Sequence, residues 1–458
     1  MMRIPGRQTP VPLIDRAPED VLFRSAAGTV TAGGFLADVG ALAACLPHAT
    51  HVVNLCEDRY RFAVAFAAAL TRGQVSLLSS DRSAERLAEP AKRFPGLYAL
   101  VDGPGWDGPL PAVGVRAAAD RCDGERADAG DAPAIPAARV AAIVFTSGST
   151  GEPVANRKLW GALAARSRDA GRRFRMTAAS PAGVVGTVPA QHMYGFETTV
   201  LLPLHAPVAS WCGPAFYPED VRAALAALPG RRILVTTPLQ MRALLQAGAE
   251  LPDLERVISA TAPLYPELAA EAERRWKAQV WEIFGATEVG SIATRRTVAG
   301  EVWTAYPRVR LHGSRNRAGE EETLVTGPFA EPCALSDLVE RLDAVRFRVL
   351  GRRTDVVKLG GRRTSLAGLN RVLTSIDGVL DGSFVAPDDL DQRPTARLLA
   401  FVVAPGLTAE AVLAGLRGRV DPLFLPRRIV HVERLPRNAL GKLPDQAVAG
   451  LRAGAGEA

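Results

Sequence analysis

A regular alternation of apolar runs with helix-like segments, between residues 140 and 284, constrains the fold of this chain most strongly. Val140–Thr146 is apolar almost throughout, which is typical of a strand that is buried on both faces. The segments that follow alternate in the same way, and such alternation predicts an α/β fold with a doubly wound, mostly parallel sheet covered by helices. The predicted strands are Gly183–Val188, Arg232–Thr236, Leu254–Ser259 and Gln279–Phe284, and the predicted helices are Leu159–Phe174, Pro218–Leu228 and Pro263–Trp276.

The N-terminal region shows a second β-α-β pattern, with a strand at His51–Leu55, a helix at Arg61–Thr71 and a strand at Gln74–Leu78. Residues 112–138 are rich in Ala, Asp, Gly and Pro, and they predict an internal linker at the surface. We therefore expect residues 1–353 to form one large N-terminal domain.

The last hundred residues have their own pattern, which predicts a small α+β domain over residues 354–458. Its strands are expected at Leu398–Val403 and Arg428–Val432, with a helix at Ala409–Arg417. The final ten residues, AGLRAGAGEA, offer little to bury, and we expect them to be frayed.

Composition narrows the class of protein. No apolar run approaches the roughly 18–20 residues that a membrane span requires, and no secretory signal is recognisable at the N-terminus. The five cysteines are scattered without a CxxC pair, which argues against disulfides and structural zinc and favours a reducing cytoplasm. The net charge is +7, but only 6% of residues are aromatic, so nucleic-acid binding is not expected.

A loop rich in hydroxyl groups and glycine directly follows the apolar strand that ends at Thr146. Glycines allow a backbone to approach an anion closely, while amides and hydroxyls donate hydrogen bonds to it. Ligands bind at the carboxyl ends of strands in open α/β sheets, so the sequence predicts a phosphate loop rather than a flexible linker. The loop residues are Thr146, Ser147, Gly148, Ser149, Thr150 and Gly151.

A second polar segment, Phe284-Gly285-Ala286-Thr287-Glu288, also follows a predicted strand. Its carboxylate, Glu288, could hold Mg²⁺ against phosphates, and the hydroxyl of Thr287 could donate to a phosphate oxygen. The ring of Phe284 could lie against a flat base.

These two motifs, together with GRRTDVVKLGG (351–361) and LPRNALGK (435–442), resemble the acyl-adenylate-forming superfamily in both order and spacing. That family includes acyl- and aryl-CoA synthetases, peptide-synthetase adenylation domains and luciferases. The resemblance implies that ATP and Mg²⁺ bind at the phosphate loop, with Thr287 and Glu288 as catalytic residues and Glu288 near the metal.

The resemblance assigns further roles. It implies that the segment Ala260 to Pro263 lines the adenine and that Asp337 and Arg352 contact the ribose. Phe284 and Gly285 are further candidates for binding the nucleotide. The remaining assigned residues are His192, beside the acyl pocket, and the catalytic lysine Lys442.

Three departures from the family pattern stand out. The family's phosphate loop ends in Pro-Lys, whereas here Val154 follows Pro153 and a lysine comes only at Lys158. In the family the C-terminal domain swings between the two half-reactions about a hinge residue that is usually Asp or Lys. That position is Thr354 here and Asp355 is the next residue, which leaves the hinge residue open. Peptide synthetases carry an aspartate after the position of His192; here the run is Tyr-Gly-Phe-Glu (194–197), so an amino-acid substrate is not expected.

Within the family, the stretches NLCEDRYRF (54–62) and QHMYG (191–195) look like the short AMP-ligases of aryl-polyene and xanthomonadin-type pigment clusters. That likeness implies activation of a hydroxylated aryl acid and transfer to a phosphopantetheine thiol, on CoA or an acyl carrier protein. The arginine-rich stretch 346–363 would suit the phosphates of CoA or an acidic carrier protein. A non-thiol acceptor and a non-catalytic nucleotide-binding module are the alternatives.

Overall fold

The structure is a computed structural model. It describes residues 9–79, 83–103, 105–115, 131–147, 153–315, 321–327, 332–352, 356–359, 362–387, 397–437, 443 and 445–456. Two compact units divide the chain. The first comprises residues 1–260, 266–310 and 325–333, and the second comprises residues 261–265, 311–324 and 334–458. The predicted domain boundary after residue 353 stays a prediction.

The larger sheet of the first unit has six strands that run parallel to one another at its centre, from β2 to β15. Its outer strands β3, β16 and β17 are antiparallel to their neighbours. The prediction of a mostly parallel α/β sheet is therefore confirmed. The spatial order is β17 (Trp303–Ala305), β16 (Gly290–Arg296), β15 (Gln279–Ala286), β14 (Arg256–Ser259), β13 (Arg231–Thr236), β11 (Ala182–Gly186), β12 (Val208–Trp211), β2 (Val21–Ser25) and β3 (Gly28–Thr31).

A smaller six-stranded sheet contains the N-terminal β-α-β pattern. Five of its strands pair in parallel, and β10 is added antiparallel to β9 at one edge. The order is β10 (Pro153–Leu159), β9 (Val140–Ser147), β5 (Val75–Leu78), β4 (His51–Asn54), β6 (Tyr98–Val101) and β7 (Ala112–Gly114).

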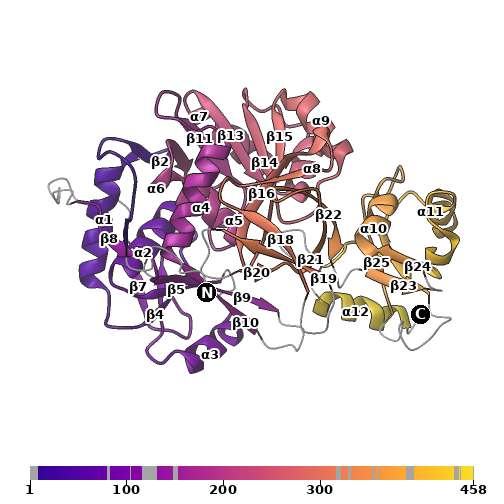
Figure 1. The fold of residues 1–458 in the computed structure, drawn as a ribbon, viewed down its shortest axis with the longest axis horizontal. Coiled ribbons are helices and arrows are strands. Elements are labelled where there is room, and N and C mark those ends of the chain that lie inside the picture. The colour runs from indigo at the N-terminus through magenta and orange to yellow at the C-terminus, as the bar shows by residue number, and fades with distance from the viewer. Residues whose placement is uncertain are drawn as a thin grey trace. The chain divides into compact units, whose positions relative to one another are not determined.

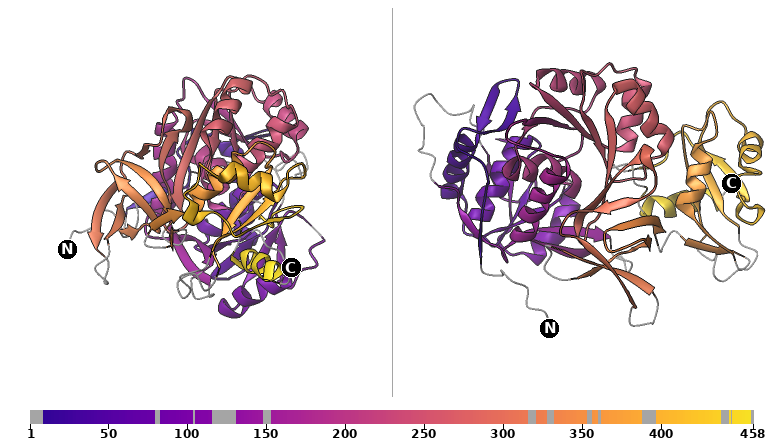
Figure 2. Two further views of the ribbon diagram at one scale, coloured as in Figure 1. Left: turned by 90° about the vertical axis from the view of Figure 1, so that its right-hand side faces the viewer. Right: turned by 45° about the horizontal axis from the view of Figure 1, so that its top comes forward.

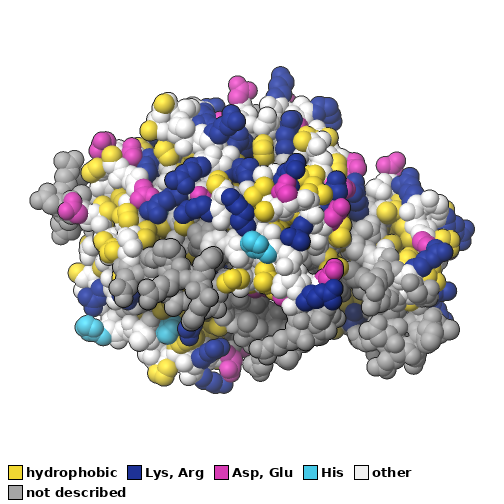
Figure 3. Space-filling view, viewed as in Figure 1, with side chains coloured by type: hydrophobic (Ala, Val, Ile, Leu, Met, Phe, Trp, Pro, Cys, Tyr) yellow, Lys and Arg dark blue, Asp and Glu magenta, His cyan; other side chains and the backbone are white. Residues whose placement is uncertain are grey.

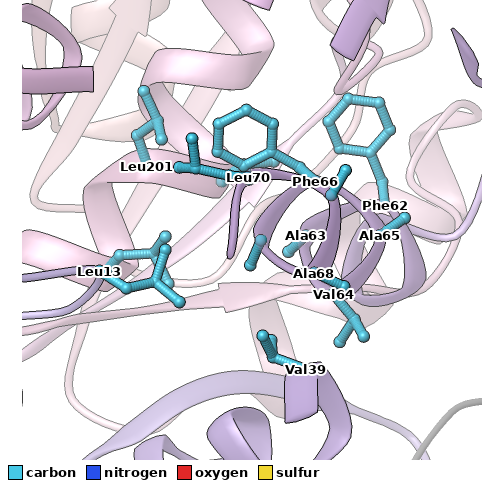
Figure 4. Packing of buried hydrophobic residues seen from close by; sticks show 14 of the residues in the cluster. Leu13, Val39, Phe62, Ala63, Val64, Ala65, Phe66, Ala68, Leu70 and Leu201 are labelled. Atoms are coloured by element: carbon cyan, nitrogen blue, oxygen red, sulfur yellow. The ribbon is translucent and has the colours of Figure 1, made fainter. Parts of the chain in front are cut away.

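A helical layer connects the two sheets. Helix α2 (Arg59–Thr71) packs against β4 and β5 of the smaller sheet, while the π-helix η2 (Phe196–Leu201) packs against β11 and β12 of the larger one. The two helices meet through aromatic rings, since the Phe66 and Phe196 centroids lie 4.8 Å apart. Figure 4 shows Phe62, Phe66 and Leu70 of α2 projecting from one helix within this apolar cluster. The rigid core of the first unit is thus continuous from sheet to sheet.

Some of the helices begin where a side chain accepts a hydrogen bond from a free backbone amide. Asp58 accepts from the amide of Arg61 at 2.8 Å at the start of α2, and Thr237 accepts from Gln240 at 3.3 Å at the start of α8 (Pro238–Gln246). Helices α7 (Pro218–Ala227), α8 and α9 (Pro266–Trp276) lie together beside the larger sheet (Figure 1). Helix α4 (Trp160–Arg173) follows β10 directly. No described helix is long and apolar enough to cross a membrane.

The second unit contains its own three-stranded sheet, β25 (Asp381–Val385), β26 (Leu399–Val403) and β27 (Arg428–His431). Helix α10 (Leu366–Thr374) packs on β25, and α11 (Ala409–Leu416) packs on β27; both are orange to yellow in Figures 1 and 2. Two further hairpin strands of this unit are β21 (Asp337–Arg341) and β22 (Arg346–Arg352). The predicted small α+β arrangement is present in this unit.

One expectation about local structure was wrong, and one strand was not predicted. The C-terminus is not frayed up to residue 456: Asp445–Gly456 forms helix α12, because Val448 and Leu451 pack against Val385, Phe401 and Leu435. Strand β10 was not predicted from the sequence; it lies between the predicted phosphate loop and α4. Within the predicted linker 112–138, β7 and β8 (Ala134–Pro136) are short strands, and residues 116–130 lie outside the described residues.

Candidate functional site

The carboxyl ends of β13, β14 and β15 form one edge of the larger sheet, and several predicted site segments begin there. Thr236 at the end of β13 is the register partner of Ser259 on β14, which in turn pairs with Glu282 on β15. The chain that leaves β14 continues into Ala260, and the chain that leaves β15 continues into Thr287. The sheet therefore brings the predicted adenine and phosphate segments to neighbouring positions.

The segment that carries His192 packs on this same edge. The hydroxyl of Tyr194 donates to the carbonyl oxygens of Ile258 at 2.7 Å and Thr236 at 3.2 Å, so it bridges the ends of β13 and β14. The hydroxyl must keep its proton to donate in these bonds. Burial favours the same neutral form, because it raises the pKa of Tyr194 well above its ordinary value. His192 itself is half-buried and stands immediately before the short helix α5 (Met193–Gly195).

A second polar contact fixes the approach to this edge. The side-chain amide of Gln240, in the first turn of α8, donates to the carbonyl oxygen of Thr187 at 3.0 Å, and the Thr187 hydroxyl donates to the side-chain oxygen of Gln240. The hydroxyl oxygens of Thr187 and Thr236 also lie within hydrogen-bond distance, 2.9 Å apart. The polar side chains of Thr187, Thr236 and Gln240 therefore satisfy one another.

Residues Ala286–Val289 form a tight turn after β15, closed by a 3.2 Å hydrogen bond from the Val289 amide to the Ala286 carbonyl. Thr287 is half-buried and Glu288 is exposed. An exposed carboxylate is able to take up a cation from solvent, as the prediction for Glu288 requires.

A buried lysine lies directly beneath this turn. The Nζ atom of Lys158, on β10, donates to the backbone carbonyl oxygen of Glu288 at 2.9 Å and also to that of Thr287. Only 3% of Lys158 is exposed. Burial, followed by the nearby positive charge of Arg166, lowers the pKa of Lys158 to about 8, so the group still carries its charge at neutral pH.

The next residues of the same segment are held by a buried ion pair. Glu197 of η2 accepts from the backbone amide of Ser291 at 3.0 Å and from its hydroxyl. Its other oxygen accepts from Arg166 of α4 at 3.0 Å. Gly290 adopts φ +81°, and a Cβ there would lie 2.5 Å from Glu197 and 2.8 Å from Arg166, so only glycine fits above the pair.

The predicted adenine segment carries backbone strain. Ala260 is buried, and Thr261 adopts φ +80°, which is rare for a β-branched residue. Such strain clusters at functional sites. The ring of Phe284 is half-buried, and its centroid lies 5.5 Å from that of Trp303.

In the second unit, the two predicted ribose contacts are partners in one hairpin. Asp337 opens β21 and stands opposite Arg352 at the end of β22. Gly351 beside it adopts φ +137°. A half-buried carboxylate at this position can accept two hydroxyl hydrogen bonds.

Several predicted residues lie outside what the structure describes. These are Gly148, Ser149, Thr150 and Gly151 of the loop, Lys442, and the hinge candidates Thr354 and Asp355; of Thr146, Ser147 and Arg352 only the backbone is described. Their roles stay predictions. The described strands nevertheless place both ends of the loop, because Ser147 and Pro153 are register partners of β9 and β10.

The described residues contain no group of three or more His, Cys, Asp or Glu side chains that could hold a metal by themselves. A lone exposed carboxylate at Glu288 fits Mg²⁺ only together with phosphate oxygens, which is how Mg²⁺ is commonly held beside nucleotides. The donor set therefore fits a metal that arrives with its nucleotide.

Doubly wound sheets, with polar turns at the carboxyl ends of two strands and a hydroxyl-rich loop between β9 and β10, define a nucleotide-binding α/β protein. The family model of AMP-binding enzymes matches residues 14–313, and the chain belongs to that family, with its acyl-CoA ligases among the relatives.

Two relatives illustrate this similarity. The 4-coumarate–CoA ligase of Rhodobacter capsulatus is 30% identical over 308 residues, covering 66% of this chain and 75% of that protein. The D-alanine–D-alanyl carrier protein ligase of Lacticaseibacillus casei is 25% identical over 365 residues, covering 67% and 70%. Among solved structures, ATP-bound MatB from Rhodopseudomonas palustris superposes with a TM-score of 0.79 at 21% identity, over 96% of this chain and 97% of that one, which shows the shared fold.

The sequence did not reveal the residues that support the turn after β15. Lys158 was recognised only as a displaced loop lysine, and Arg166 and Glu197 had no assigned role. A faint signal exists only for Glu197, which stands within the mostly apolar run Tyr-Gly-Phe-Glu-Thr-Thr-Val-Leu-Leu. Only the fold shows that these charges meet.

Proposed function

We propose that this protein activates a carboxylic acid with ATP to form an acyl-adenylate and then transfers the acyl group to a phosphopantetheine thiol. The observation that carries the proposal is the link between the two phosphate motifs. Lys158 on β10 ties the hairpin that bears the loop 147–153 to the Thr287–Glu288 turn. The hairpin that leads into the proposed phosphate loop is thereby tied to the proposed magnesium turn, which supports a shared site for the triphosphate.

In the first half-reaction, an oxygen of the substrate carboxylate attacks the α-phosphorus of ATP. A new P–O bond forms, the bond to the β-phosphate breaks, and pyrophosphate leaves. The loop hydroxyls and Thr287 would bind phosphate oxygens, and Glu288 would hold the magnesium ion. That ion, when bound, neutralises phosphate charge. Lys442 would stabilise the negative charge that develops at the α-phosphate.

In the second half-reaction, the thiol sulfur attacks the carbonyl carbon of the adenylate. A C–S bond forms, the C–O bond to AMP breaks, and the thiol proton goes to solvent. We propose CoA or an acyl carrier protein as the thiol donor; the names of the two relatives include one acceptor of each kind. Seven basic residues and one acidic residue between Arg346 and Arg363 suit either polyanion.

We propose a hydroxylated aryl acid as the substrate, within the biosynthesis of an aryl-polyene-type pigment. A free carboxylate for an α-ammonium group is missing from the run after His192, because Glu197 is already paired with Arg166 and Ser291. That pairing supports a substrate without an amino group. The name of the coumarate ligase relative supports an aromatic acid.

The experiment is pyrophosphate release by the purified protein with ATP, Mg²⁺ and a panel of acids. The panel holds hydroxybenzoates, cinnamates, medium-chain fatty acids and amino acids, and Lys442→Ala serves as the catalytic control. Release with an aryl acid that Lys442→Ala loses would support the proposal. Adding CoA or a purified carrier protein then identifies the acceptor by mass. Absence of release with every acid, while ATP still binds, would leave a non-catalytic nucleotide-binding role as the better account.

A further inference from the structure

The turn at Thr287–Glu288 lacks a strand partner of its own. Residues 287–289 lie between β15 and β16, and the amide of Val289 donates to the carbonyl oxygen of Ala286 at 3.2 Å. Two successive carbonyl oxygens of this turn, those of Thr287 and Glu288, instead accept from a single ammonium group. A charged donor that binds two successive carbonyl oxygens restricts the rotation of the peptide groups that carry them.

The ammonium group is built into the fold rather than lying at the surface. Lys158 stands at the end of β10, where the register with β9 shifts between Lys158 and Leu159, and it is 3% exposed. A side chain so buried, with its ammonium bound to two carbonyls, is not a free cation for the predicted phosphate loop, whose last residue, Gly151, lies seven positions earlier. The family pattern would place a lysine in the phosphate loop. In this chain the nearest following lysine instead binds the backbone of the Thr287–Glu288 turn.

The residue that follows the turn into β16 is held by a separate set of contacts. Glu197 of η2 accepts a hydrogen bond from the backbone amide of Ser291, and Arg166 of α4 in turn donates to Glu197. The turn therefore has one clamp at its start, from β10, and one at its end. Losing the first clamp would free Thr287 and Glu288 while leaving β16 in place.

We propose that Lys158 is a positioning residue for adenylation: it fixes the Thr287–Glu288 turn to the β9–β10 hairpin, so that the hydroxyl and carboxylate meet the nucleotide together with the phosphate loop. The proposal rests on the proposed function of Thr287 and Glu288. It gives Lys158 no direct contact with substrate.

The test compares Lys158→Met with Lys158→Arg, which keeps a charged donor. The matched control is Lys92→Met, because the Lys92 side chain is 74% exposed and pairs only at the surface with Glu89. Hydrogen exchange of the peptide covering residues 285–291 is measured first, without nucleotide. We expect Lys158→Met to raise its exchange about tenfold or more, with little change in peptides of β11 and β13, and Lys92→Met to leave it unchanged.

Pyrophosphate release is measured next. We expect Lys158→Met to lower kcat/KM for ATP about 10- to 100-fold, mostly through kcat, and Lys158→Arg to recover part of the loss. Thermal unfolding of each variant checks that the fold persists. Exchange at 285–291 that matches the wild type, or raised exchange with unchanged kcat, would overturn the proposal.

Failure of the proposed function would look different. If the wild-type protein released no pyrophosphate with any acid, the proposed adenylation would be contradicted, whatever the exchange data show. The exchange measurement would still decide whether Lys158 fixes the turn, because it needs neither acid nor catalysis.

Discussion

Asp337 and Arg352 stand directly opposite each other across the antiparallel β21–β22 pair. The two residues are 15 positions apart in the chain, yet the hairpin register places them side by side at its open end. The resemblance to the family predicted a ribose contact for each of these two residues separately. The register supplies a physical reason for their joint assignment, since one sugar can contact two register partners.

Asp337→Asn is expected to raise the KM for ATP about tenfold to a hundredfold, because a neutral amide loses a charge-assisted bond to the ribose hydroxyls. The measurement is pyrophosphate release against ATP concentration. Glu340→Gln is the matched control, since Glu340 is exposed on the same strand and pairs with Arg348 at 2.8 Å. An equal effect of both substitutions would show that the strand's charge, and not the ribose contact, matters.

Glu288→Gln is expected to raise the Mg²⁺ concentration that gives half-maximal pyrophosphate release by about tenfold, because an amide is a weaker ligand for a hard cation. The backbone carbonyl that Lys158 binds is retained, so the turn itself should persist. Glu301→Gln, another exposed carboxylate of the first unit, controls for net charge. A Mg²⁺ requirement that stays at the wild-type value would remove Glu288 from the metal site.

The large-scale fold could be predicted because its cause is local. Buried parallel strands are apolar along their length, so β9, β11, β13, β14 and β15 were recognisable to within about three residues. Strand β10 was missed because it is polar along part of its length, with Asn156, Arg157 and Lys158 in sequence. The C-terminal helix was missed because two apolar residues among alanines and glycines look insufficient until their partners Val385 and Phe401 are known.

The candidate site divides in the same way. Motifs such as Thr287-Glu288 stand together in the sequence, and their position after a strand could be predicted. The supporting charges could not, because Lys158, Arg166 and Glu197 meet only through the packing of β10, α4 and η2. Burial of a charge is costly without a partner, so such residues reveal their role only when the partner is seen.

Stability should fall as the pH drops from about 6.5 towards 4 because of His205. Burial lowers the pKa of His205 to about 4, from an ordinary value of 6.5. Its Nδ1 atom lies 3.0 Å from the carbonyl oxygen of Leu201, and its ring centroid 5.4 Å from that of Trp160. Between pH 6.5 and 4 the unfolded chain therefore binds a proton at His205 that the folded chain does not bind. The stability that the neutral His205 contributes to the folded state is fully present only above pH 6.5.

The measurement for His205 is the thermal midpoint between pH 4 and 8. His205→Gln should flatten the fall between pH 6.5 and 4, whereas His48→Gln, at an exposed histidine, should keep the wild-type slope. An unchanged slope in His205→Gln would assign the acid sensitivity to other groups.

Breaking the buried pair between Arg166 and Glu197 should strongly destabilise the first unit. Their side chains are 4% and 9% exposed, so removing one charge leaves the other without compensation in a low-dielectric environment. Glu197→Gln is expected to lower the free energy of unfolding by about 3–5 kcal/mol, while the double variant Arg166→Met with Glu197→Gln should lose less than the sum of the two single changes. Denaturant unfolding of all four proteins gives the coupling energy. Additive losses would mean that the pair does not act as a unit, and that Glu197 holds Ser291 without help from Arg166.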